Sequence, residues 1–132
     1  MLCPLVFSRS NIAANLNDQA MQLGVGADEF IAPFDGYIAA ISVVSNAALG
    51  GGSFAVNPVI DGTQADDQVI IETGELRDTK YYNPRAITVN KGQRVGCAFD
   101  TSAAFTPTTA DISVVVWYMA VRNDPPAQYW TG

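Results

Sequence analysis

The chain has 132 residues, of which 48% are hydrophobic and 15% are charged. This length predicts one domain with one core, and the charged fraction is low beside the roughly 25% of an average soluble chain, which favours a protein that hides surface in an assembly. The net charge of −6 argues against nucleic acid as a partner, because phosphate binding requires clustered Lys and Arg. The chain has no histidine, which excludes Ser-His-Asp and Cys-His catalysis and His-ligated zinc.

The first 27 residues are predicted to form an N-terminal arm that packs on a partner. Residues 8–22 are rich in Asn, Ala, Ser and Gln, a composition that predicts extended chain with short strand pieces. A short helix over residues 12–23 is the alternative, although the Asn and Asp residues in and beside that stretch disfavour a helix. The arm side chains expected to bury on a neighbour are Leu5, Phe7, Ile12, Leu16, Met21 and Leu23.

Residues 28–122 are predicted to form a β-sandwich, because apolar residues come in short runs broken by Gly, Pro, Asn and Asp. Turn signals recur about every 8–12 residues, which predicts an all-β jelly-roll sandwich of about eight antiparallel strands. Residues 73–85 are expected to form a long polar loop that carries Tyr81 and Tyr82. The expected strands are residues 29–32, 37–45, 54–60, 68–72, 86–90, 94–100 and 111–122.

Aromatic side chains outside the predicted core are candidates for partner binding. Trp117 and Tyr118 are adjacent on one strand and so point to opposite faces: one fills the core, and the other faces a neighbouring subunit or solvent. The short tail, residues 123–132, carries Pro125-Pro126 ahead of two aromatics. Anchoring to a neighbouring subunit is favoured over sugar stacking, and a tail folded on its own core stays open as an equal alternative. The candidates are Tyr81, Tyr82, Tyr129 and Trp130.

No motif in the sequence predicts catalysis, a cofactor or a metal site. Gly50-Gly51-Gly52 lacks the Lys that a P-loop requires after its glycines. The acidic turn at Asp61 and Asp66-Asp67 lacks the spacing of an EF-hand. We therefore expect no catalytic residue, no cofactor and no metal ligand.

The two cysteines and the hydropathy pattern give further expectations. Cys3 and Cys97 form no CxxC motif, Cys97 is expected to be a small buried hydrophobe, and whether the two cysteines pair stays open. The longest apolar run, residues 114–121, is too short to span a membrane, so no membrane partner is expected.

The stretches FIAPFDGYIAAISVV at residues 30–44 and ITVNKGQRVGCAF at residues 87–99 share features of one known fold. They resemble the opening strands and a Lys-Gly turn in the jelly roll of complement-type globular heads and the tumour necrosis factor superfamily, with residues 111–118 supplying the closing strand. The same pattern occurs in virion proteins of tailed bacteriophages, including head decoration (cement) proteins and fibre tips. The resemblance covers residues 28–122 and implies a trimer with a binding role and no chemistry.

The leading hypothesis is a capsid decoration protein that clamps neighbouring subunits of the major capsid protein and stabilises the head. It implies a homotrimer on the outer capsid surface of the virion, made in the host cytoplasm, with the arm and the tail buried on neighbours. The alternative is a phage tail or fibre tip whose receptor or glycan site lies in loops 46–53, 73–85 and 101–110. A small hydrolase or a trimeric nucleotide enzyme is the third hypothesis, and the missing histidine and the missing phosphate-binding motif weigh against it.

Overall fold

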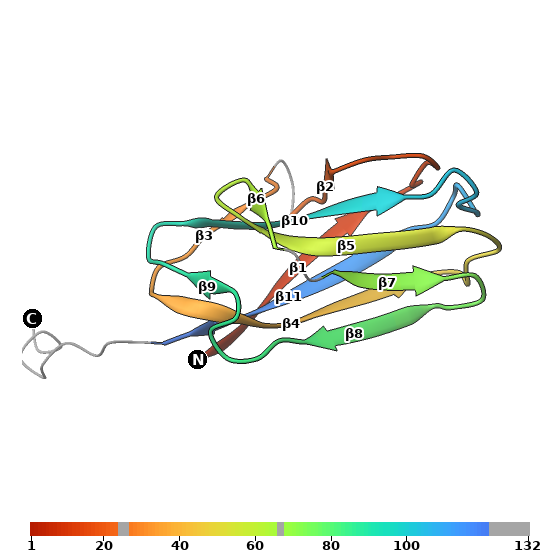
Figure 1. The fold of residues 1–132 in the computed structure, drawn as a ribbon. Coiled ribbons are helices and arrows are strands. Elements are labelled where there is room, and N and C mark those ends of the chain that lie inside the picture. Colours follow the sequence, from red (N-terminus) through yellow and green to blue (C-terminus); the bar gives the residue numbers. More distant parts are fainter. Residues whose placement is uncertain (24–26, 66–67, 122–132) are drawn as a thin grey trace, which may run out of the picture.

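A computed structural model describes residues 1–23, 27–65 and 68–121, which form two antiparallel β-sheets packed face to face (Figure 1). Sheet A contains, in this order, β1 (Leu2–Arg9), β11 (Ile112–Ala120), β4 (Gly36–Ser45) and β8 (Arg77–Tyr81), and β9 (Thr88–Val89) also pairs with β4. Sheet B has β10 (Arg94–Thr101) and β5 (Ser53–Ile60) at its centre, flanked by β2 (Gln19–Ala20), β3 (Phe30–Ile31), β6 (Thr63–Gln64) and β7 (Val69–Glu72). The prediction of an all-β sandwich is confirmed.

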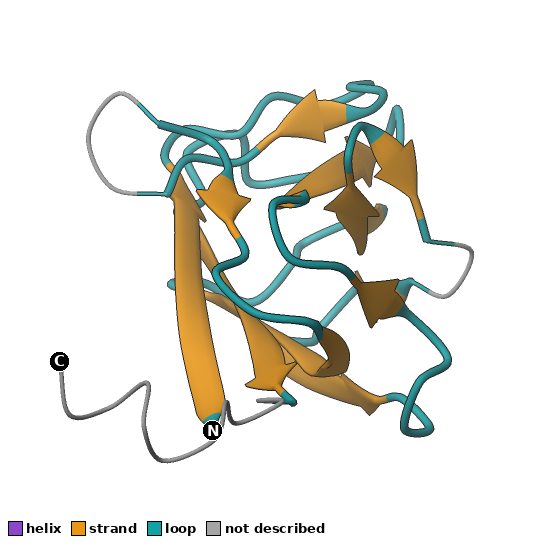
Figure 2. Ribbon diagram, turned by 90° about the vertical axis from the view of Figure 1, so that its left-hand side faces the viewer, coloured by secondary structure: helices purple, strands orange, loops and turns teal. Residues whose placement is uncertain are grey.

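The chain crosses between the two sheets at most of its connections. β1 lies in sheet A, β2 and β3 lie in sheet B, β4 returns to sheet A, and β5 to β7 lie in sheet B. β8 and β9 follow in sheet A, before β10 in sheet B and β11 in sheet A. Figure 2 shows the loops that join the two layers. The first and last strands of the chain therefore lie side by side in sheet A.

The core lies between the sheets and is built by alternate side chains of the long strands. Phe54 and Phe99 stack across β5 and β10 with their ring centroids 5.1 Å apart. The hydroxyl of Tyr118 donates a hydrogen bond to the carbonyl of Phe34, which satisfies the polar atom of a fully buried ring. The buried side chains of β11 are Ile112, Val114, Val116, Tyr118 and Ala120. Tyr118 thus fills the core and Trp117 points outward.

The segment predicted as an N-terminal arm is instead part of the sandwich, so that prediction is wrong. β1 pairs with β11 along its whole length, from Leu2 opposite Met119 to Arg9 opposite Ile112. Four of the six arm side chains expected to contact a neighbour are buried in the chain's own core, and the other two pack partly buried against it. The buried four are Leu5, Phe7, Ile12 and Met21, and the partly buried two are Leu16 and Leu23.

Turn chemistry explains why the N-terminal composition was misleading. Asn11, Asn15 and Asp18 have positive φ angles of 51°, 59° and 50°, a conformation that Asn and Asp tolerate better than most residues. The connection between β1 and β2 is fixed by backbone hydrogen bonds, including Ile12 N–H to the Ala110 carbonyl at 3.2 Å. Its Asn and Asp residues therefore shape a tight crossing between the sheets.

The predicted polar loop at residues 73–85 contains a strand. β8 pairs with β4, from Val44 opposite Arg77 to Ala40 opposite Tyr81. Its sequence RDTKY is polar because β8 is an edge strand, and this composition hid it from a hydrophobicity pattern. Conversely, the strand predicted at residues 86–90 is shorter than expected and consists of the two residues of β9.

Candidate interaction surface

Strand register places a continuous set of side chains on the outer face of sheet A, the face that points away from sheet B. The core residues of β11 alternate with residues that point outward, and residues paired across neighbouring strands lie on the same face. The outer face of sheet A consists of Leu2, Pro4, Val6, Ser8, Tyr37, Ala40, Ser42, Val44, Arg77, Thr79, Tyr81, Ser113, Val115, Trp117 and Met119.

This face is apolar, and Arg77 is its one charged residue. The side chains of Leu2, Val6, Val44 and Tyr81 are exposed by 47%, 52%, 48% and 80%. An antiparallel sheet with one face in a core ordinarily presents polar residues on the other face, whereas strands covered on both faces are apolar throughout. β1 and β11 follow the second pattern over most of their length, although the outer side of this sheet is exposed in this chain.

A hollow opens on this face, toward the end of the sheet that carries Leu2. Trp117, Ala40 and Tyr81 are consecutive cross-strand partners, so one small side chain lies between two aromatic ones. The resulting cavity has a volume of about 330 Å³ and is also lined by Leu2, Ala39, Ser42 and Thr79. The Thr79 hydroxyl donates a hydrogen bond to the Ser42 hydroxyl at 3.2 Å. The hollow is therefore an apolar depression with two hydroxyl groups.

The open edge of sheet A is poorly suited to pairing with a further strand. Met1 and Ala120 exchange both of their backbone hydrogen bonds, so by alternation the even-numbered residues of β1 turn their backbone groups to the open edge. On that edge Pro4 has no N–H, and Ser8 already exchanges backbone hydrogen bonds with Gln22. A partner of sheet A is therefore expected on its face and not on its β1 edge.

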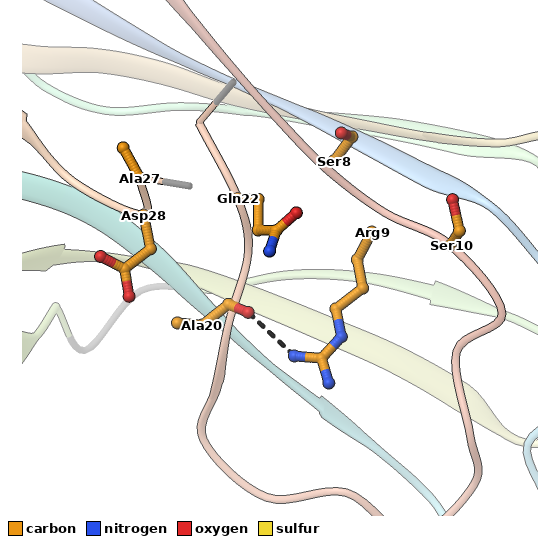
Figure 3. Close-up of a pocket in the computed structure, with 7 residues that line it drawn as sticks. All are labelled: Ser8, Arg9, Ser10, Ala20, Gln22, Ala27 and Asp28. Atoms are coloured by element: carbon orange, nitrogen blue, oxygen red, sulfur yellow. Dashed lines mark hydrogen bonds between the residues drawn. The ribbon is translucent and has the colours of Figure 1, made fainter. Parts of the chain in front are cut away.

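A second hollow, of about 630 Å³, is polar and lies beside the end of β1 (Figure 3). Arg9 donates a hydrogen bond to the Ala20 carbonyl at 3.0 Å, and its guanidinium carbon lies 5.3 Å from the centroid of the Phe99 ring. Arg9 thus ties β1 to sheet B. Figure 3 shows Asp28 on the other side of the hollow, with Gln22 between the two charged groups. Its described lining residues contain no nucleophile paired with a general base.

The outer face of sheet B is different in character. Gly96 and Ala98 make its centre small, and beside them lies a hollow of about 330 Å³ bordered by Asp18, Asp28 and Glu29. Arg94 forms ion pairs with Glu29 at 3.4 Å and with Asp61 at 3.5 Å. The backbone N–H of Arg94, with its side chain, holds the pKa of Asp61 below its usual value. Among the described residues, no group of three or more Cys, Asp and Glu side chains is arranged to hold a metal ion.

The structure separates the predicted partner-binding residues. Tyr81 lies exposed at the aromatic hollow, whereas Tyr82 is buried in the core with Leu5, Phe7, Ile12 and Met21. Leu16 and Leu23 pack against that core, and Tyr129 and Trp130 lie outside the described residues. Sequence reasoning missed Pro4, Val6, Val115 and Met119. The sequence does carry a signal for them. In β1 and β11, both the residues that face the core and those that face outward are uncharged, apart from Arg9.

The cysteines are both free, with Cys3 half-buried and Cys97 buried. Cys97 is 2% exposed, which confirms the prediction of a small buried side chain. Burial raises the pKa of the Cys97 thiol far above its usual value, so this group is held in its protonated form. A thiol in that state is a poor nucleophile.

Parts of the three loops proposed for a receptor site meet at one end of the sandwich. Gly50 N–H donates to the Thr106 carbonyl at 2.9 Å, and Gly74 N–H donates to the Leu49 carbonyl at 2.7 Å. Phe105, an aromatic residue of this cluster, is 1% exposed and faces the core. The described loop tip therefore presents small and hydroxyl-bearing residues, and Tyr81 lies at the far end of β8.

Neither a scan of protein-family models nor a search of curated proteins found a match to this chain. Within the described residues, no helix is long and apolar enough to cross a membrane. The fold and the surface define the structural class of the protein: an all-β sandwich that exposes one apolar sheet face.

Proposed function

We propose that this chain is a non-enzymatic structural protein of a virion, of the capsid-decoration kind. It assembles as a homotrimer through the outer face of sheet A and clamps neighbouring subunits of the major capsid protein on the outer surface of the head. The exposed apolar outer face of sheet A carries the proposal. The assignment to a virion is supported by the low content of charged residues and by the resemblance to phage jelly-roll proteins. The alternation of strands between the two sheets supports that resemblance.

Covering this face stabilises an assembly. An interface of ordinary size buries about 800 Å² per partner, and if about 500 Å² of that is apolar its burial contributes about 12 kcal/mol, against an association cost of about 4–15 kcal/mol. The face spans four adjacent strands and carries two aromatic side chains at its hollow. Aromatic residues are among those that most often dominate the free energy of an interface.

Charge favours other copies of the same chain on this face. Each copy has a net charge of −6, so copies repel one another at most orientations. The outer face of sheet A has no carboxylate, and its one charge is the positive Arg77 at the β8 edge. Copies that meet there bring no acidic groups together. The acidic outer face of sheet B then stays outside the trimer, available to the shell.

Binding to capsid shells tests the decoration role. We expect the wild-type protein to co-sediment with shells of its major capsid protein at saturating stoichiometry and to raise the temperature at which they disrupt. A Val115→Asp variant, which loses the trimer, is expected to bind far more weakly because it loses multivalent attachment. Shells that gain neither bound protein nor stability from the wild-type trimer would contradict the decoration role.

A deletion of residues 1–23 is unsuitable for testing a docking arm. It would remove β1 and with it Leu5 and Phe7, so the sandwich would lose an edge strand and part of its core. Lost capsid binding would then report unfolding and not a lost contact.

The meeting of three loops at one end of the sandwich favours a receptor-binding tip as a second candidate function. In that role the trimer would present the hydroxyl-rich loop tip to a receptor or glycan. Binding of the isolated trimer to a glycan array or to host cells, lost on Thr106→Ala but kept on Val6→Ala, would favour the tip over decoration.

A further inference from the structure

The aromatic hollow on sheet A sets a requirement for anything that covers this face. Its cavity of about 330 Å³ lies between Trp117 and Tyr81, with Ala40 as its floor. Two sheet faces laid together would leave such a cavity empty, and an unfilled apolar cavity forfeits contacts on every side. A tight interface therefore needs one large side chain that projects into the hollow.

The strand β11 ends close to the hollow. Trp117 lies three residues before Ala120, where β11 ends, and the Val121 N–H donates to the Asp35 carbonyl at 2.8 Å. Figure 1 shows the N-terminus and the end of β11 at the same end of the sandwich. The eleven residues from 122 to 132 follow this point, and at about 3.3–3.6 Å per residue they reach up to roughly 36–40 Å. That reach exceeds the roughly 10 Å that separates two sheets packed face to face, so the segment is long enough to reach a copy that packs on sheet A.

The composition of residues 122–132 fits the hollow. Pro125-Pro126 favours an extended chain and offers no N–H for pairing, so this segment is better suited to presenting side chains than to adding a strand. It carries the adjacent aromatics Tyr129 and Trp130 and only two charged residues. An indole can stack between the rings of Trp117 and Tyr81, while its N–H is free to donate to the Ser42 or Thr79 hydroxyl.

We infer that residues 122–132 of a neighbouring copy dock Trp130 into the hollow between Trp117 and Tyr81, an inference that rests on the self-association proposed above. The neighbour is favoured over the same chain because β11 runs past Trp117 and away from the hollow before it ends at Ala120, so docking on its own sheet would require the chain to reverse direction. In a cyclic assembly each copy gives one segment and receives one.

The experiment measures the subunit dissociation constant of the full chain by sedimentation velocity. Trp130→Ala and deletion of residues 122–132 are each expected to raise it about 10- to 100-fold, the effect of losing a central aromatic anchor. Gln128→Ala, in the same segment, is the matched control and is expected to change it less than about 2-fold. Thr79→Trp fills the hollow from its exposed rim, and combined with Trp130→Ala it should weaken assembly no more than either change alone.

Fluorine NMR of 5-fluorotryptophan-labelled protein identifies which copy holds Trp130. We expect the Trp130 resonance to shift on assembly and to return to its free position on dilution. Unchanged dissociation constants for Trp130→Ala and the deletion, with assembly still lost in Val115→Asp, would overturn the inference and leave the sheet A trimer standing. A Trp130 resonance that stays shifted in the dilute monomer would assign the segment to its own sheet. A wild-type chain that is monomeric at every concentration would overturn both proposals.

Discussion

The two sheets bury the same kind of apolar core, yet their outer faces differ. Sheet A presents Val6 and Trp117 with one charged residue, Arg77, whereas sheet B combines glycine and alanine with exposed Ile31 and Ile70 and is bordered by carboxylates. Both sheets contribute apolar side chains to the core. Packing of the core therefore does not explain why the outer face of sheet A is apolar. This contrast is the observation on which the proposed interface on sheet A rests.

The edges sharpen this contrast. On β1 the open edge is interrupted by Pro4 and closed at one end by the bonds between Ser8 and Gln22. β8 is short, and its exposed polar residues, Asp78 among them, make it a poor template for a further strand. Both edges of sheet A are therefore poorly suited to pairing with a further strand, and its outer face is the expected contact surface.

The largest expected effect separates the two sides of one strand. Phe7→Ala removes a fully buried ring from β1 and is expected to lower the free energy of unfolding by about 3–5 kcal/mol. Val6→Ala, one residue earlier on the outer face, is expected to change it by less than about 0.5 kcal/mol in the dissociated chain. Urea unfolding of dilute protein compares the two, and equal losses would show that the outer side is already covered within one chain.

A smaller effect distinguishes the two faces by salt. Raising sodium chloride from about 0.05 M to about 0.5 M is expected to strengthen self-association several-fold, because it screens the repulsion between acidic copies and leaves apolar contact intact. Sedimentation velocity at each salt concentration gives the dissociation constant. Assembly that weakens as salt rises would instead point to ion pairing, and so to the carboxylates on sheet B.

The smallest expected effect concerns the charges around sheet B. The folded state lowers the pKa of Asp61, chiefly through the Arg94 backbone N–H, so this carboxylate stabilises the fold above its unfolded pKa of about 3.9. That stabilisation is lost as pH falls through the lower, folded pKa. We expect Asp61→Asn to be slightly less stable than wild type at pH 7 and to match it in strong acid. If the difference in stability between Asp61→Asn and wild type persists at the lowest pH, its cause is the turn geometry and not the carboxylate charge.

The central strands of the fold were predictable from sequence, because they combine apolar runs with turn residues. The strands expected at residues 37–45 and 94–100 match β4 and β10 to within one residue, and that at 111–122 contains β11. β1 was assigned to an arm, since its following Asn and Asp residues look flexible until their positive φ angles are seen. β8 was missed, because a polar edge strand has the composition of a loop.

The interaction surface was only partly predictable. The opposite orientation of Trp117 and Tyr118 follows from strand geometry, and the exposure of Tyr81 was expected, although in a loop. The hollow itself depends on the register that aligns Trp117, Ala40 and Tyr81 across three strands that are far apart in sequence. Composition carries no information on that alignment, so no single-strand pattern reveals it.

The most direct test of the account is the mass of the particle in solution, measured by light scattering during size-exclusion chromatography. The proposed assembly through the outer face of sheet A predicts a trimer for the wild-type chain and a monomer for Val115→Asp. The matched control is Ile70→Asp, an apolar-to-acid change at an exposed position of sheet B, which is expected to remain a trimer. A wild-type monomer, or a trimer lost in Ile70→Asp and kept in Val115→Asp, would contradict the account.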